Sequence, residues 1–223
     1  MTKDLFFQAI FKFILGAAVV CLLLLLPAGT INYWNAWLLM GILFVPMFFA
    51  GIIMMFKNPE LLKKRLNAKE KQLEQKLVIK LSGLMFVSGF VSAGLNFRYG
   101  WFILPDWISW VAALFFLFGY LLYAKVLQEN IYLSRTIEVQ ENQKVIATGL
   151  YGIVRHPMYA ATVILFLSMP LVLGSLVSLA FFLVYPLIIA KRIHNEENVL
   201  EKELEGYLEY KQRVKYKLIP FIW

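Results

Sequence analysis

Four long apolar stretches, separated by short polar segments, make up most of the first 127 residues of the chain. They lie at 9–26, 34–56, 81–97 and 108–127. Each is close to the roughly 20 residues that a helix needs to cross a bilayer. The pattern therefore predicts four transmembrane helices in this part of the chain.

A fifth apolar region, 157–190, contains no charged side chain. As a single helix it would be roughly 50 Å long, well beyond a hydrocarbon core of roughly 30 Å. Leu173, Gly174 and Ser175 interrupt the region near its middle, with Pro170 just before them. We therefore expect a tight hairpin of two arms of about 15–17 residues, which is short for a full span. The hairpin raises the expected number of transmembrane helices to about six, and the sequence leaves open whether each arm crosses fully.

Basic residues predict how the chain is oriented in the membrane. Segment 57–80 holds eight Lys or Arg residues against three Glu, and the positive-inside rule puts such a loop in the cytoplasm. The N-terminus is then cytoplasmic too, and the hairpin returns to the same face at Lys191. The spacing of apolar residues in 191–213 predicts a C-terminal amphipathic helix along that face. The apolar tail, 216–223, is expected to pack back as a lid or an interface anchor.

Composition agrees with this membrane architecture. The chain is 61% hydrophobic and only 16% charged, whereas soluble domains are nearer half apolar and a quarter charged. We predict an all-α integral membrane protein with one transmembrane domain, 1–223. Its formal net charge of +8 suits an anionic membrane surface, and no nucleic-acid motif occurs in the sequence. Membrane lipids, and no nucleic acid, are therefore the expected macromolecular surroundings.

Charged and aromatic side chains gather in two polar segments beside the hairpin, the central segment 149–160 and the later segment 191–210. Two histidines and one distant cysteine cannot form a usual zinc site, so we expect no metal. The sequence also lacks a P-loop, a nucleophile elbow and a glycine-rich dinucleotide motif. The arginines, tyrosines and paired glutamates could hold a zwitterionic cofactor beside a lipid-borne substrate. The residues alone equally allow Arg155 and Arg192 to meet phospholipid headgroups while the glutamates form surface ion pairs.

The pattern TGLYGIVRHPMYAA, an apolar hairpin, RIHNEENVLEKELEGYLEYKQRV and a closing LIPFIW resembles the isoprenylcysteine carboxyl methyltransferase family. It also resembles the wider group of integral-membrane methyltransferases that includes phospholipid N-methyltransferases. The resemblance covers about residues 128–223, including the segment NIYLSRTIEV. It implies that 128–223 is the cofactor-binding catalytic part and that 1–127 is a four-helix membrane scaffold.

The resemblance also implies a pocket for S-adenosylmethionine. The cofactor-binding residues carried over from it are Gly149, Tyr151, Arg155, His156, Pro157, Tyr159, Glu196, Glu197, Tyr207 and Tyr210. Those carried over for catalysis are Arg192, His156 and Glu197. The implied reaction is direct displacement at the sulfonium methyl. A carboxylate acceptor needs no general base, whereas an amine needs one, for which His156 or a glutamate is a candidate.

We therefore expect methyl transfer to a lipid-like or prenylated acceptor at the cytoplasmic membrane face, as carboxylate O-methylation. Alternatives are amine or phospholipid N-methylation, an NADPH-dependent reductase of the sterol-reductase type, and a non-enzymatic scaffold or transporter. The reductase family's closing motif carries Arg-Cys and a Trp that this chain lacks, and we detect no internal repeat of the transporter kind. The expected location is the bacterial inner membrane, with both termini and the active site cytoplasmic.

Overall fold

The structure is a computed structural model that describes residues 3–66, 73–134, 136–137 and 139–223. Throughout this part of the chain the regular elements are helices, and the extended backbone contributes one isolated bridge, between Ile103 and Ser175. The helices are α1 (Lys3–Ala28), α2 (Trp34–Lys57), α3 (Pro59–Leu66), α4 (Leu73–Tyr99), α5 (Asp106–Glu129), the 3-10 turn η1 (Gly149–Gly152), α6 (Pro157–Val172), α7 (Leu176–Phe182), α8 (Tyr185–Glu203) and α9 (Tyr207–Arg213).

Five helical segments of the described chain are long and apolar enough to cross a membrane. They are α1, α2, α4, α5 and the combined stretch Leu176–Glu203, which contains α7 and α8. The remaining apolar helix, α6, has 16 residues and is shorter than a usual span. The protein is thus an all-α integral membrane protein, as predicted, with five candidate spans and one short apolar helix.

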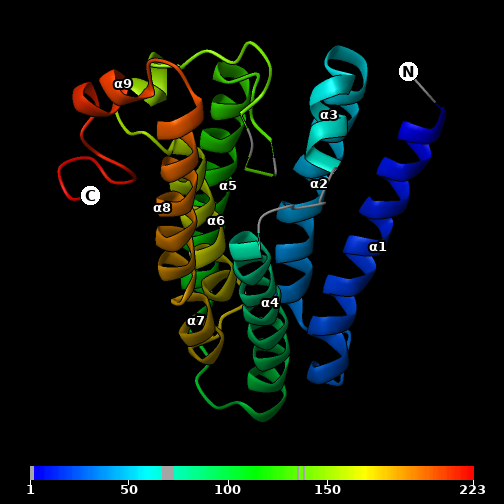
Figure 1. Cartoon of the computed structure of the whole chain (residues 1–223). Coiled ribbons are helices and arrows are strands. Elements are labelled where there is room, and N and C mark those ends of the chain that lie inside the picture. The colour runs from blue at the N-terminus through cyan, green and yellow to red at the C-terminus, as the bar shows by residue number, and fades with distance from the viewer. Residues whose placement is uncertain (1–2, 67–72, 135, 138) are drawn as a thin grey trace.

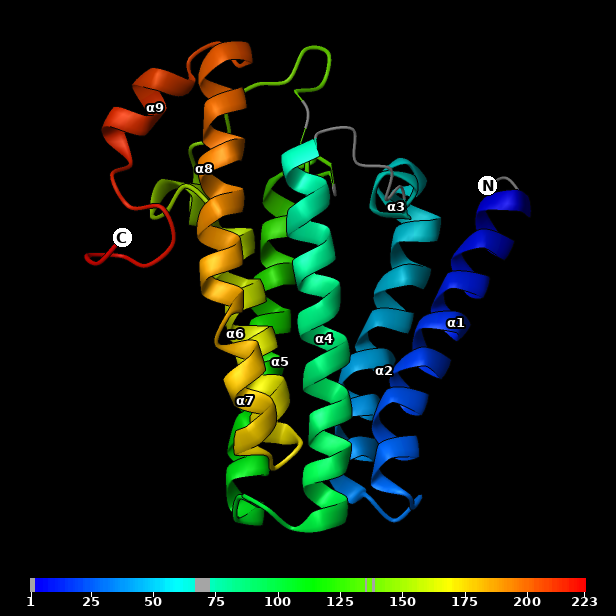
Figure 2. The ribbon, with the colours of Figure 1, turned by 60° about the horizontal axis from the view of Figure 1, so that its bottom comes forward.

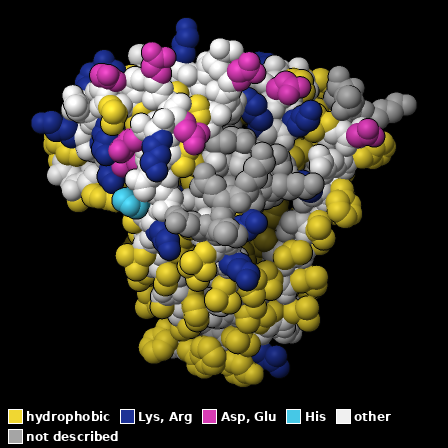
Figure 3. Space-filling view, in the orientation of Figure 1, with side chains coloured by type: hydrophobic (Ala, Val, Ile, Leu, Met, Phe, Trp, Pro, Cys, Tyr) yellow, Lys and Arg dark blue, Asp and Glu magenta, His cyan; other side chains and the backbone are white. Residues whose placement is uncertain are grey.

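The long helices run side by side, and the extramembrane parts gather at one end (Figures 1 and 2). Helix α6 packs along α5, while α4 lies against α1, α7 and α8. Figure 3 shows charged side chains collected at the end that carries α3 and α9, above a body whose surface is mostly hydrophobic. Helix α4 begins at Leu73, eight residues before the expected start at residue 81, because its first two turns lie in the polar part of the molecule.

The predicted hairpin is confirmed, and its turn is fixed by polar contacts. Gly174 has φ +67°, a conformation that favours glycine. Its carbonyl accepts from the backbone N–H of Leu104 at 2.9 Å. From the start of the second span, the Tyr33 hydroxyl donates to the Leu173 carbonyl at 2.6 Å and the Asn35 amide donates to the Val172 carbonyl at 3.1 Å. Residues at the start of α2 and just before α5 therefore hold the turn of the hairpin in place.

The polar segment after the hairpin differs from the expected single helix over 191–213. Helix α8 begins at Tyr185, within the apolar arm, and runs unbroken to Glu203, so its polar part extends the last candidate span. The chain then turns at Gly206, which has φ +81°, and α9 departs in another direction (Figure 1). The amphipathic pattern identified the helical residues correctly, but it carries no information on whether they are collinear with the span before them.

Candidate active site

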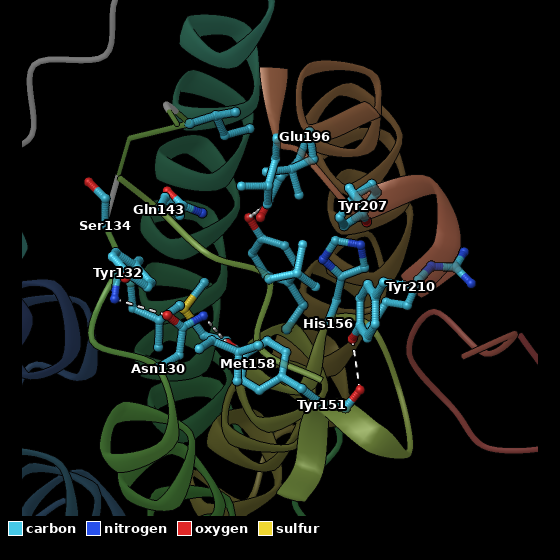
Figure 4. Close-up of a pocket in the computed structure, with 18 of the residues that line it drawn as sticks. Asn130, Tyr132, Ser134, Gln143, Tyr151, His156, Met158, Glu196, Tyr207 and Tyr210 are labelled. Carbon is cyan, nitrogen blue, oxygen red and sulfur yellow. Dashed lines mark hydrogen bonds between the residues drawn. The ribbon is translucent and has the colours of Figure 1, made fainter. Parts of the chain in front are cut away.

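A cavity lies at the charged end of the bundle, between the loop after α5, the start of α6, and the ends of α8 and α9 (Figure 4). In the close-up, Asn130 and Tyr132 lie on the loop side and Glu196 and Tyr207 lie across from them. Eight of the eleven expected site residues line this cavity, namely Tyr151, Arg155, His156, Tyr159, Arg192, Glu196, Tyr207 and Tyr210. The other three, Gly149, Pro157 and Glu197, lie outside its lining.

Glu197 is buried behind the cavity, with 2% of its surface exposed. Its Oε1 accepts from Nε of Arg155 at 2.7 Å and lies 3.2 Å from Nε2 of His156. Its Oε2 lies 3.0 Å from Nζ of Lys217. Buried charges need partners of this kind. The Glu197 carboxylate therefore ties α8 to the central segment and to the segment that follows α9.

Arg155 strengthens the same junction because its Nε and Nη1 donate to protein groups around it. Besides Glu197, it donates through Nη1 to the carbonyls of Val214 and Lys215 at 2.7 and 2.8 Å. The backbone N–H groups of Arg155 and His156 donate to the carbonyls of residues 216 and 217, both at 2.9 Å. The expected lid thus lies behind the cavity, bonded to the central segment, while Phe221 beyond it is 87% exposed.

A second network joins Glu196 to the membrane scaffold. The Tyr159 hydroxyl donates to Oε2 of Glu196 and accepts from Nε of Arg192 at 2.8 Å. The Arg192 guanidinium lies over the Tyr159 ring at 5.9 Å and donates through Nη1 to Oε1 of Gln75 at 3.2 Å. The two neighbouring glutamates therefore have different surroundings, since Glu196 lines the cavity and Glu197 stands behind it.

Tyr207 contributes a polar group that the protein leaves unsatisfied. Its hydroxyl is buried and has no hydrogen-bond partner among the described residues, although the side chain lines the cavity. Burial, reinforced by Glu197 and Glu196, raises the pKa of this hydroxyl well above its usual range, so it remains a donor at neutral pH. A buried donor without a partner is uncommon in native proteins and indicates a place for a ligand acceptor.

Gly149 and Pro157 shape the backbone around the cavity. Gly149 has φ +60°, and a Cβ there would lie 2.4 Å from Oε1 of Glu129. The same carboxylate accepts from the backbone N–H of Leu150 at 2.8 Å, which fixes η1 against the end of α5. Pro157 occupies the first turn of α6, where its missing N–H costs nothing.

Sequence reasoning named no site residue in the loop 130–147, although NIYLSRTIEV was part of the resemblance. Ten described residues of this loop line the cavity. One of them is Asn130, whose amide donates to the Tyr151 hydroxyl at 3.0 Å. From the scaffold, Lys64 of α3 donates to the side chain of Gln140 in this loop at 2.6 Å. The quoted segment was the available signal for the loop, whereas no pattern in the sequence indicated Gln75 or Lys64.

The donor set of the cavity fits S-adenosylmethionine. The buried Tyr207 hydroxyl can donate to an adenine or carboxylate acceptor, and the Glu196 carboxylate can accept from ribose hydroxyls or an ammonium group. The Tyr207 and Tyr210 rings lie 5.7 Å apart, centroid to centroid, and aromatic faces attract a sulfonium cation.

Comparisons with known proteins match a family model to part of the chain and a solved structure to its fold. Residues 96–202 match the model of the isoprenylcysteine carboxyl methyltransferase family. The structure is similar to that of the eukaryotic intramembrane Ras methyltransferase, an isoprenylcysteine carboxyl methyltransferase, with a TM-score of 0.57 and 16% sequence identity. This likeness covers 98% of the chain and 85% of the solved one, and it shows a shared fold.

A curated relative of another activity is also similar in sequence. The chain is 30% identical over 91 residues to the Delta(14)-sterol reductase of Mus musculus. The match covers 40% of this chain and 22% of the reductase, so the chain spans less than a quarter of that relative's length.

Proposed function

Residues 96–202 belong to the isoprenylcysteine carboxyl methyltransferase family, and from this premise we propose that the protein is an integral membrane methyltransferase that uses S-adenosylmethionine. The acceptor is a lipid-like or prenylated carboxylate, methylated at the cytoplasmic face of a bacterial inner membrane. Residues 128–223 form the catalytic part and 1–127 the scaffold of one domain. The proposal rests mainly on one observation, that eight of the expected site residues line a single cavity although they come from segments far apart in the sequence.

The residues around the cavity have separate tasks in this proposal. Glu196 and the Tyr207 hydroxyl hold polar groups of the cofactor, while the Tyr210 ring covers it. Arg192, fixed by Tyr159 and Gln75, orients the acceptor's carboxylate. When bound, the cofactor supplies an electrophilic methyl group, whose bond to sulfur breaks as the acceptor oxygen attacks.

The site favours an acceptor that needs no general base. Nε2 of His156 lies 3.2 Å from the Glu197 carboxylate. This nitrogen already has a hydrogen-bond partner, so it is poorly placed to take a proton from an acceptor. A carboxylate acceptor needs only desolvation and orientation. His156 and Glu197 are then positioning residues that support the wall of the cavity.

A reductase is the second candidate, because of the similarity to the sterol reductase. NADPH carries several phosphate charges, which require cationic partners. Arg155, a cation of the cavity lining, directs its Nε and Nη1 at Glu197 and two backbone carbonyls. Arg192 and Lys144 also line the cavity, so direct binding of each cofactor separates the two candidates.

The test is calorimetric titration of the detergent-purified protein with S-adenosylmethionine and, separately, with NADPH. We expect micromolar binding of S-adenosylmethionine, about −8 kcal/mol. Tyr207→Phe should weaken it about three- to tenfold, because one ligand hydrogen bond is lost. Tyr216→Phe is the matched control and should bind as the wild type does. A folded wild-type protein that binds NADPH but neither S-adenosylmethionine nor its demethylated product would reverse the assignment.

A further inference from the structure

Gln75 is a polar residue in a place where polar residues are costly. It opens the membrane-spanning stretch of α4, Gln75–Tyr99, and is 0% exposed. An amide that is removed from water without full hydrogen bonding destabilises the fold. The position of Gln75 therefore calls for a physical explanation.

The amide of Gln75 is only half satisfied. Its Oε1 accepts from Nη1 of Arg192 at 3.2 Å. Its Nε2 is buried and has no hydrogen-bond partner within the described residues. Nε2 carries two N–H donors, so the side chain holds a cavity-lining arginine with one end and presents unused donors with the other.

Gln75 lies at the scaffold end of the network that crosses the site. The network runs from Glu196 through Tyr159 and Arg192 to Gln75. Glu196 and Tyr207, the two groups assigned above to the cofactor, both line the cavity. The Gln75 end belongs to α4, and one turn further along α4 Ile79 is 41% exposed at the apolar surface.

We propose that Gln75 is an acceptor-binding residue, whose Nε2 donates to the anionic oxygen of a prenylated carboxylate held beside Arg192. The inference rests on the proposed function and extends it to the N-terminal scaffold. A cation and an adjacent amide donor suit a carboxylate, whereas they would repel or fail to satisfy an ammonium group. The apolar tail of the acceptor lies along α4, on the surface that includes Ile79. Gln75 thus selects for the charged oxygen, while the scaffold accommodates the lipid.

The test compares cofactor and acceptor binding in Gln75→Leu and Gln75→Glu. Leucine is close in size to glutamine and lacks both amide atoms, while glutamate places a negative charge beside Arg192. The control is Lys76→Gln, at the exposed neighbouring position. The probes are S-adenosylmethionine, N-acetylated S-farnesylcysteine with its free carboxylate, and the carboxamide of the same compound as a competing ligand.

We expect Gln75→Leu to raise the KM for the carboxylate about tenfold, because a hydrogen bond to a charged group is lost. The Kd for S-adenosylmethionine should stay within about twofold of the wild-type value, since among the described contacts Gln75 reaches that side through Arg192. Gln75→Glu should raise the KM further. In both variants the preference for the carboxylate over the carboxamide should shrink, an effect that a purely structural role would not produce.

Each contrary result has its own meaning. If the wild-type protein does not bind S-adenosylmethionine, the proposed function itself is refuted. A wild type that binds the cofactor but not the farnesylated carboxylate would overturn the acceptor assignment and this inference with it. If Gln75→Leu leaves the acceptor KM and the carboxylate preference unchanged, or weakens cofactor and acceptor equally, Gln75 is not an acceptor-binding residue and the proposed function stands.

Discussion

Glu196 and Glu197 are adjacent in the sequence and stand in opposite surroundings. Glu196 lines the cavity and accepts from a tyrosine hydroxyl, whereas Glu197 is enclosed by Arg155, His156 and Lys217. Adjacent helical positions point about 100° apart, so two identical side chains can serve a ligand and a structural junction separately. The sequence could not separate their roles, because the pattern Glu-Glu is symmetric.

This difference predicts different phenotypes for the same substitution. Glu197→Gln leaves Arg155 buried without a counter-charge and should lower the free energy of unfolding by about 3–5 kcal/mol. Glu196→Gln should weaken S-adenosylmethionine binding about tenfold, because a charge-assisted hydrogen bond is lost. It should change the thermal unfolding midpoint little. Equal loss of stability in the two variants would contradict the assignment of a ligand role to Glu196 and a structural role to Glu197.

At the scale of elements, the turn η1 depends on a close approach between Gly149 and the end of α5. A side chain at Gly149 would collide with the Glu129 carboxylate and would also be strained at φ +60°. The bond from Leu150 N–H to Glu129 depends on the same approach. Tyr151, which lines the cavity, follows directly in this turn.

Gly149→Ala should therefore destabilise the protein by about 1–3 kcal/mol and weaken cofactor binding through displacement of η1. Gly83→Ala is a suitable control, since no atom lies within 4 Å of a Cβ at that position. The two variants can be compared by thermal unfolding and by titration. An alanine at 149 that is tolerated as well as one at 83 would show that η1 does not need the close approach.

The helices were more predictable than their mutual arrangement. Apolar runs located the five candidate spans and the short helix α6, and Gly174 marked the hairpin turn correctly, because both are local properties of the chain. The continuity of α8 past Ala190 was missed, since an amphipathic period is the same for a separate helix and for an extension. Gln75 was missed because nothing in the basic segment distinguishes it, and its role depends on Arg192, 117 positions away.

At the scale of the whole molecule, the site is assembled from parts that lie far apart in the chain. Helix α4 supplies Gln75, the central segment supplies Arg155 and His156, and residues 214–217 close the back of the cavity. The N-terminal helices therefore reach the site through the contact between Gln75 and Arg192.

Truncation tests the contribution of the segment after α9. A chain that ends after Leu218 keeps the four carbonyls bonded to Arg155 and His156, together with Lys217, and should bind S-adenosylmethionine normally. A chain that ends after Arg213 loses all of these contacts and should lose binding by at least tenfold, since several charge-assisted hydrogen bonds disappear. Calorimetry on both proteins checks the prediction, and equal binding would refute the role of residues 214–217.

The short α6 has a consequence for depth in the bilayer. Helices α5 and α6 are joined at the end of the bundle that carries the hairpin turn, where Ser109 donates to the Leu171 carbonyl at 3.3 Å. From this junction α5 continues to Glu129 and α6 returns to Pro157, so the start of α6 lies about 9 Å short of the far end of α5 at a rise of about 1.5 Å per residue. If α5 ends at the headgroups, the start of α6 would lie below them, within reach of a lipid-borne acceptor. Acyl-chain length then becomes a control on turnover, because a thicker membrane buries the entrance for the water-soluble cofactor.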